Sequence, residues 1–291
     1  MRLTTCLKAV SEGPACYSQM LRLRLLTAAI LLPLLVAAMF LLPNAWWSLA
    51  LIAPLLMAGH EWARLAAFDR NGQTAFLATL AAASVALWVI AIPGTGAPHA
   101  GAALSERSVY ALSAAFWCVI APCWLWLKLV VRHRMVLATA GLIVLLPTWL
   151  ALSRLQHDPT LLLLLLAVIW IADTAAYFAG RALGRHKLAP IISPGKTWEG
   201  VGGAFAAVTV YALTLYFSLF LTRYPQFNAQ LVVSAFLVMT AFGIEGDLFE
   251  SWLKRSAGVK DSGAIFPGHG GMLDRIDALT AALPLAALIF I

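Results

Sequence analysis

Long apolar stretches recur along the chain from Leu21 to the last residue. A helix that crosses the hydrocarbon core of a bilayer needs about 20 consecutive apolar residues, and the stretches here have this length. Only 11% of the residues are charged, whereas a soluble domain usually carries about 25%. Because the stretches are continuously apolar and do not alternate, they indicate helices and not membrane-spanning strands. The sequence therefore predicts an all-α, polytopic transmembrane helical bundle.

Hydropathy in a window of about 19 residues divides these stretches into about nine predicted spans. They cover residues 25–42, 46–63, 74–92, 109–130, 135–152, 160–180, 200–221, 231–249 and 272–291. If the N-terminus is cytoplasmic, only Arg107, Arg154 and Arg223 among the 20 lysines and arginines fall on the outer side. Basic residues are enriched in cytoplasmic loops, so we expect a cytoplasmic N-terminus and a C-terminus on the outer side.

The chain divides into three predicted regions. Residues 1–20 are polar and lack a pattern, so we expect a disordered cytoplasmic extension. Residues 21–160 hold few charges within their apolar stretches and are expected to form a scaffold of transmembrane helices. Residues 161–291 hold nearly all the intramembrane polar groups, so we expect the catalytic site there. The basic residues behind the net charge of +7 lie between the spans. This placement indicates that they set the topology and bind anionic lipid or nucleotide, and it excludes a nucleic-acid partner.

Six carboxylates lie where a bilayer makes charge costly. A charged group at the centre of a spanning helix costs roughly 2.5–3.5 kcal/mol on insertion scales, so such residues are candidates for function. All six approach the predicted cytoplasmic face, where their repulsion calls for a hard cation such as Mg²⁺. Ion pairs with neighbouring lysines and arginines are the alternative, which is strongest for the two glutamates. The six residues are Asp173, Glu245, Asp247, Glu250, Asp274 and Asp277.

The segment around the eighth span combines carboxylates with groups suited to phosphate. Asp247, Ser251 and Lys254 stand at i, i+4 and i+7, which places them on one face of a helix. The loop at 254–271 has basic residues in its first half and glycines in its latter part. Glycine lets backbone N–H groups close on phosphate oxygens, and the basic side chains supply charge. This pattern predicts a metal and phosphate site.

Two short patterns resemble known motifs but do not have their spacing. Lys196 and Thr197 follow a glycine as in a P-loop, but the first glycine of that motif falls at Pro190. The two residues still lie next to a predicted helix N-terminus, which favours anions. His60-Glu61 does not begin a zinc-protease motif, because Arg64 occupies the place of the second histidine.

The run from Ser251 to Asp277 resembles the signature of the phosphatidate cytidylyltransferases (CDP-diacylglycerol synthases). That pattern asks for Ser, then Lys-Arg, Lys-Asp, a small residue, Pro-x-His-Gly-Gly and Asp-Arg-x-Asp at fixed spacing. The chain supplies every element, as Ser251, Lys254-Arg255, Lys260-Asp261, Gly263, Pro267, His269-Gly270-Gly271 and Asp274-Arg275-x-Asp277. Weaker stretches at 173–184 and 193–200 agree, although related sequences often have a lysine at the position of Gly195.

The resemblance implies an integral membrane nucleotidyltransferase of phospholipid biosynthesis, which makes CDP-diacylglycerol and pyrophosphate from CTP and phosphatidate. It implies Mg²⁺ on Asp247 and Asp274, and it leaves room for a second cation such as K⁺. We further expect Asp173 and Asp277 to be supporting metal ligands or to lie next to them. The other expected catalytic residues are Lys254, Arg255, Lys260, His269, Arg275 and Asp277. The expected substrate-binding residues are Ser193, Lys196, Thr197, Ser251, Gly270 and Gly271. The implied location is the cytoplasmic face of a bacterial inner membrane, and homodimerisation stays open.

Two rival functions stay open on the sequence alone. A CTP-dependent polyprenol kinase could share this kind of scaffold and also use CTP in a membrane. An ion-coupled transporter would also carry intramembrane carboxylates, but its charges would lie at the midplane of two repeated halves. The charges here gather at one predicted face, which favours the transferase.

Overall fold

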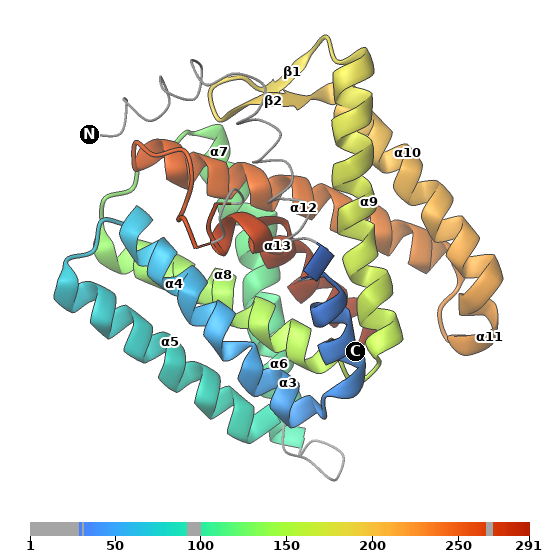
Figure 1. Cartoon of the computed structure of the whole chain (residues 1–291), viewed down its shortest axis with the longest axis horizontal. Coiled ribbons are helices and arrows are strands. Elements are labelled where there is room, and N and C mark those ends of the chain that lie inside the picture. The colour runs from blue at the N-terminus through green and yellow to red at the C-terminus, as the bar shows by residue number, and fades with distance from the viewer. Residues whose placement is uncertain (1–28, 31, 92–99, 266–269) are drawn as a thin grey trace.

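The computed structural model describes residues 29–30, 32–91, 100–265 and 270–291 as a bundle of helices (Figure 1). The expectation of a disordered extension at 1–20 lies outside these residues, and so does His269. Within them the prediction of a mostly helical protein is confirmed, with one small hairpin added.

Among the described residues of the first half of the chain, seven helices contribute to the bundle. They are Leu32–Leu41, α3 (Asn44–Ala50), α4 (Ile52–Leu65), α5 (Arg70–Ala91), α6 (Ala100–Ala115), α7 (Ala121–Trp126) and α8 (Arg134–Leu155). A π-helical turn, Phe116–Ile120, joins α6 to α7 just before Pro122. Proline has no N–H for the regular ladder, and a widened turn accommodates that loss without ending the helix.

The second half of the chain forms the rest of the bundle. Its elements are α9 (Pro159–Leu183), β1 (Lys187–Ala189), β2 (Ser193–Thr197), α10 (Trp198–Leu215), a π-helical turn (Tyr216–Phe220), α11 (Leu221–Arg223), α12 (Ala229–Ser256) and α13 (Leu273–Phe290). Side chains cap three of the helix starts: Asp158 accepts from the N–H of Leu161, and Asn228 from that of Leu231. Thr197 caps α10 in the same way. Such caps satisfy N–H groups that have no partner within the helix.

Six helices in the described ranges are long and apolar enough to cross a membrane. They are Arg70–Ala91, Glu106–Trp126, Arg134–Leu155, Pro159–Leu183, Trp198–Arg223 and Ala229–Ser256. Each overlaps one predicted span, so these six predictions agree in length and composition. The predicted span at 46–63 is divided between α3 and α4 at Leu51. The total of nine spans and the orientation of the termini stay predictions.

A cluster of aromatic rings around Phe249 of α12 packs the two halves of the chain against each other. The ring of Phe249, whose residue is 1% exposed, packs against Trp62 of α4 at a centroid distance of 6.4 Å. It also contacts Phe116, Trp117 and Trp124 at 5.5, 5.4 and 5.5 Å. Aromatic pairs at these distances are favourable beyond the area that they bury. Because Phe249 directly precedes Glu250, this packing fixes the rotation of α12 and the direction of its polar face.

The prediction of an all-α chain with a simple loop at 193–200 is wrong in one respect. Strands β1 and β2 form an antiparallel hairpin in which Lys187 pairs with Thr197 and Ala189 with Ser193. The hairpin lies at the end of α9 and leads into α10 (Figure 1). Its tip is held from outside, because Ile192 is buried and its carbonyl accepts a hydrogen bond from Arg255 of α12. These tertiary contacts explain why a short segment with Pro and Gly forms strands.

Candidate active site

The site is built on a close crossing of α12 and α13. Gly246 faces the backbone of α13, and a Cβ atom there would lie 3.2 Å from the carbonyl carbon of Asp277 and 3.3 Å from Cα of Ala278. Contacts of that length are tighter than ordinary van der Waals packing, so the crossing depends on glycine. It brings Asp247, the next residue on α12, to the same crossing as Asp277.

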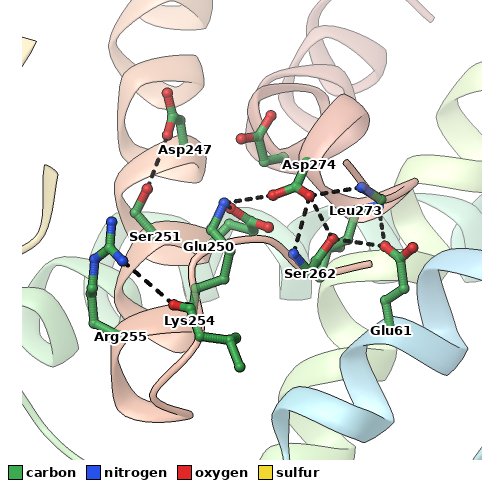
Figure 2. Close-up of polar contacts among 12 residues, drawn as sticks. Glu61, Asp247, Glu250, Ser251, Lys254, Arg255, Ser262, Leu273 and Asp274 are labelled. Atoms are coloured by element: carbon green, nitrogen blue, oxygen red, sulfur yellow. Dashed lines mark hydrogen bonds and ion pairs between the residues drawn. The ribbon is translucent and has the colours of Figure 1, made fainter. Parts of the chain in front are cut away.

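Lys254 links the two helices through buried ion pairs (Figure 2). Its ammonium nitrogen lies 2.6 Å from Oδ1 of Asp274 on α13. It also pairs with Glu250, one turn earlier on α12. The side chains of Lys254, Glu250 and Asp274 are 12%, 4% and 10% exposed. Two carboxylates therefore share one ammonium group where little water reaches them, and the lysine is held in a fixed position.

Asp274 also closes the loop between α12 and α13 onto the start of α13. Its Oδ2 accepts hydrogen bonds from the N–H and hydroxyl of Ser262, at 3.1 and 2.9 Å, and from the N–H of Gly271, at 2.8 Å. Gly270 has a φ of +83°, which glycine adopts readily and other residues rarely do. The left-handed turn points the following N–H at the carboxylate. Ser262 and Gly271, on either side of the connection between the two helices, are thus both held at Asp274.

Glu61 of α4 is a site residue that the sequence reasoning missed. The residue is 1% exposed. Its carboxylate accepts hydrogen bonds from the hydroxyl of Ser262 at 2.8 Å and from the N–H groups of Met272 and Leu273 at 3.0 and 2.8 Å. We considered this residue only as part of a metalloprotease pattern. The signal that could have found it is the one applied to the other six carboxylates, a charge inside a predicted span.

A further ion pair joins the hairpin to α12. The ammonium nitrogen of Lys196 on β2 lies 2.6 Å from Oδ2 of Asp247, and the hydroxyl of Ser251 donates to Oδ1 at 3.3 Å. Asp173 of α9 and Asp277 of α13 are close enough to interact electrostatically with Asp247. Three carboxylates from three helices therefore gather around one lysine.

The remaining predicted residues have different surroundings. Arg255 donates to the backbone carbonyls of Ile192 and Val259, both at 3.4 Å, and so ties the hairpin to the loop. Thr197 is buried, and its hydroxyl accepts from the N–H of Gly200, so it is engaged as a helix cap. The other predicted phosphate contacts lie on the surface or in the loop: Lys260 and Arg275 are exposed, and Ser193 and Gly270 are half-buried.

The donor atoms suit a hard cation only in combination with a substrate. Among the described residues, no group of three or more Asp, Glu, His or Cys side chains is arranged to hold a metal ion. Mg²⁺ in nucleotide enzymes usually binds one or two carboxylates together with substrate phosphates. Asp247 fits this role, because its side chain is 34% exposed and two further carboxylates are near. Both carboxylates are paired, Asp247 with Lys196 and Asp274 with Lys254, but the side chain of Asp274 is only 10% exposed.

Comparison with known proteins identifies the family of the chain. The sequence model of the Cytidylyltransferase family matches residues 22–291. The chain belongs to the cytidylyltransferase family. The matched range contains the hairpin, α12 and α13, and with them the residues whose contacts are described above. The resemblance that the signature indicated is therefore confirmed.

Three relatives in this family are named phosphatidate cytidylyltransferase. The protein from Pseudomonas aeruginosa is 38% identical over 92% of this chain and 96% of its own length. The protein from Haemophilus influenzae is 32% identical over 91% of this chain and 96% of its own length. A protein from Staphylococcus aureus is 46% identical, over 43% of this chain and 46% of its own length. The first two matches include both halves of the bundle.

Proposed function

We propose that this chain is a phosphatidate cytidylyltransferase, which joins the cytidylyl group of CTP to phosphatidate and releases pyrophosphate. The observation that carries the proposal is that signature residues meet in one network at the α12–α13 crossing. Lys254 and Gly271, two signature residues, donate to the carboxylate of Asp274, a third. Ser262, which lies between two signature positions, donates to it as well. The two relatives that match more than nine-tenths of the chain have this activity as their name.

The proposed reaction is an in-line displacement. A phosphate oxygen of phosphatidate forms a bond to the α-phosphorus of CTP, and the bond from that phosphorus to the leaving pyrophosphate oxygen breaks. The second pKa of a phosphate monoester is about 6, so the attacking group is largely dianionic near neutral pH and needs no strong base. The main obstacle is repulsion between two anions. Catalysis then rests on positioning and on neutralising charge.

The cationic side chains of the site would perform that neutralisation. Lys196 and Lys254 are positioned by carboxylates, and the negative charge of a bound phosphate would compete with those carboxylates for each ammonium group. Lys260 and Arg275 are exposed and would contact phosphates at the protein surface. Arg255 would keep the hairpin attached to α12. His269 stays a candidate for protonating the departing pyrophosphate.

We propose Asp247 as the principal Mg²⁺ ligand, with Asp173 and Asp277 supporting it. Asp274 would join only when Lys254 moves from its Oδ1 to a substrate phosphate, since that oxygen is otherwise paired. When bound, Mg²⁺ would neutralise phosphate oxygens and stabilise the leaving group. The hydrogen bond from Ser251 to Asp247 would orient the carboxylate toward the cation.

We further propose that the site faces the cytoplasm at a bacterial inner membrane. Basic residues are concentrated in the loops on the side of the hairpin and the α12–α13 loop, as the positive-inside pattern requires. The relatives come from bacteria. Phosphatidate would then reach the site from the inner leaflet, and CTP from the cytosol.

The test uses the detergent-purified chain with phosphatidate, CTP and Mg²⁺, followed by lipid extraction and pyrophosphate measurement. The proposal predicts equal amounts of pyrophosphate and of a lipid that carries cytidine. A polyprenol kinase would need another lipid acceptor and would leave no cytidine on its product. Failure to form a cytidine-bearing lipid in wild-type protein that is folded and supplied with both substrates would refute the proposed function.

A further inference from the structure

We infer that Glu61 is a positioning residue. Its carboxylate, from α4, holds the start of α13 and thereby fixes the location of Asp274. The inference rests on the proposed function, because it concerns the same site. It assigns a role in the reaction to a helix that the sequence assigned only to the scaffold.

Glu61 performs the task of a helix cap from a distant part of the chain. The first N–H groups of a helix have no partner within it, and α13 has no hydrogen bond from a side chain of its own N-cap, Met272. The carboxylate of Glu61 accepts from the N–H groups of Met272 and Leu273, at 3.0 and 2.8 Å. A negative group there is also favoured by the positive end of the helix.

Two glycines of the signature are explained by this carboxylate. A Cβ atom at Gly263 would lie 2.7 Å from Cδ of Glu61 and would clash with Oε1. A Cβ atom at Gly271 would clash with both carboxylate oxygens of Glu61 and with the hydroxyl of Ser262. The signature asks for a small residue at the first position and for glycine at the second. Gly263 and Gly271 therefore leave free the space that the carboxylate of Glu61 occupies.

Ser262 couples Glu61 to Asp274. Its hydroxyl oxygen lies 2.8 Å from Oε2 of Glu61 and 2.9 Å from Oδ2 of Asp274 (Figure 2). A hydroxyl has one proton, so it donates to only one of the two carboxylates at a time. The position of Glu61 thus determines the position of a donor to Asp274, and a change at residue 61 reaches the catalytic carboxylate through one intermediate side chain.

Glu61→Gln and Glu61→Asp test the inference, with Glu106→Gln as the matched control. Glu106 is also a buried glutamate of the first half, 4% exposed, and it pairs with Arg154 at 2.9 Å. That pair lies at the C-terminal end of α8, whereas Glu61 is next to Trp62, which donates to Leu137 near the other end of α8. The control removes a buried charge without touching the loop.

We expect Glu61→Gln to lower kcat by about 10–100-fold, the usual cost of removing a group that orients a ligand, with little change in KM for CTP. Glu61→Asp retains the charge and should keep more of kcat than Glu61→Gln. Glu106→Gln should lower the unfolding temperature and leave kcat near the wild-type value. A Glu61→Gln enzyme with the kcat of the control, or a kcat no lower than that of Glu61→Asp, would overturn the inference.

Gly263→Ala keeps the test decisive if Glu61→Gln does not fold. This change retains the carboxylate of Glu61 but displaces it, so we expect the same fall in kcat. Gly202→Ala is its control, because a Cβ atom at Gly202 meets nothing within 4 Å. Equal kcat in these two variants would count against the inference. An inactive wild-type protein would instead refute the proposed function and leave these contacts unexplained by catalysis.

Discussion

Replacement of Lys254 with methionine removes the ammonium group between two buried carboxylates, Glu250 and Asp274. Methionine retains much of the length of the side chain, so the change acts mainly through charge. The three side chains are 12%, 4% and 10% exposed, so water screens them weakly. Removal of one partner of such a buried pair costs about 3–5 kcal/mol, because the remaining charge loses its compensation. We expect Lys254→Met to lower the free energy of unfolding by this amount.

A second substitution separates stability from catalysis. Glu250→Gln in the Lys254→Met background neutralises one of the two uncompensated carboxylates, so it should restore about 1–3 kcal/mol. Turnover should stay about 10²–10³-fold low in both variants, because the cation that the proposed reaction directs to the phosphates is missing. Unfolding in detergent measures the first quantity, and formation of labelled lipid from CTP measures the second.

The control is Arg134→Met. Arg134 pairs with Asp69 at 3.0 Å, but both side chains are more than half exposed, so the loss should be under about 1 kcal/mol. The reasoning is refuted if Lys254→Met is no less stable than this control. It is also refuted if the double variant is no more stable than Lys254→Met, or if it recovers turnover.

Three further substitutions give separate tests. Asp274→Asn should abolish turnover while the protein still folds, as judged by its elution in gel filtration; near-normal turnover would remove Asp274 from the reaction. Gly246→Val should force α12 and α13 apart and lower both stability and kcat, whereas Gly202→Ala should change neither, and equal effects would mean that the crossing at Gly246 is not tight. Gly195→Lys should leave stability unchanged, because a Cβ atom there meets nothing within 4 Å. A lowered unfolding temperature would show that the position has no room for a side chain.

The long helices could be predicted because their signal is local. The spans at 135–152 and 160–180 correspond to α8 (Arg134–Leu155) and α9 (Pro159–Leu183). Their limits follow from features that are visible in the sequence, such as the proline after Asp158 at the start of α9. Apolar length is a property of consecutive residues, so no knowledge of packing was needed to identify these helices.

The hairpin could not be predicted in this way. Its strands have three and five residues, too few for a periodic pattern, and β2 contains both proline and glycine. What stabilises it comes from elsewhere, namely the hydrogen bond from Arg255 to Ile192 and the ion pair between Lys196 and Asp247. Both partners lie on α12, more than fifty residues later in the chain.

The site was predicted in its components but not in its pairings. Asp247 and Lys254 share a helix face, as their spacing indicates, yet Lys254 binds Asp274 and Asp247 binds Lys196. Spacing along one helix says which residues face the same way, and the partner is decided by the neighbouring element. Glu61 illustrates the same limit, since its contacts with Ser262 and Leu273 span about two hundred residues of sequence.

The central claim is that this network transfers the cytidylyl group, and the position of the label in CTP tests it most directly. Purified protein is incubated with phosphatidate, Mg²⁺ and CTP that is labelled either at the α-phosphate or at the γ-phosphate, and the lipid is extracted. The account predicts α-label in the lipid and γ-label in pyrophosphate, with both lost in Asp274→Asn. Label from the γ-phosphate in the lipid, or none from the α-phosphate, would contradict it.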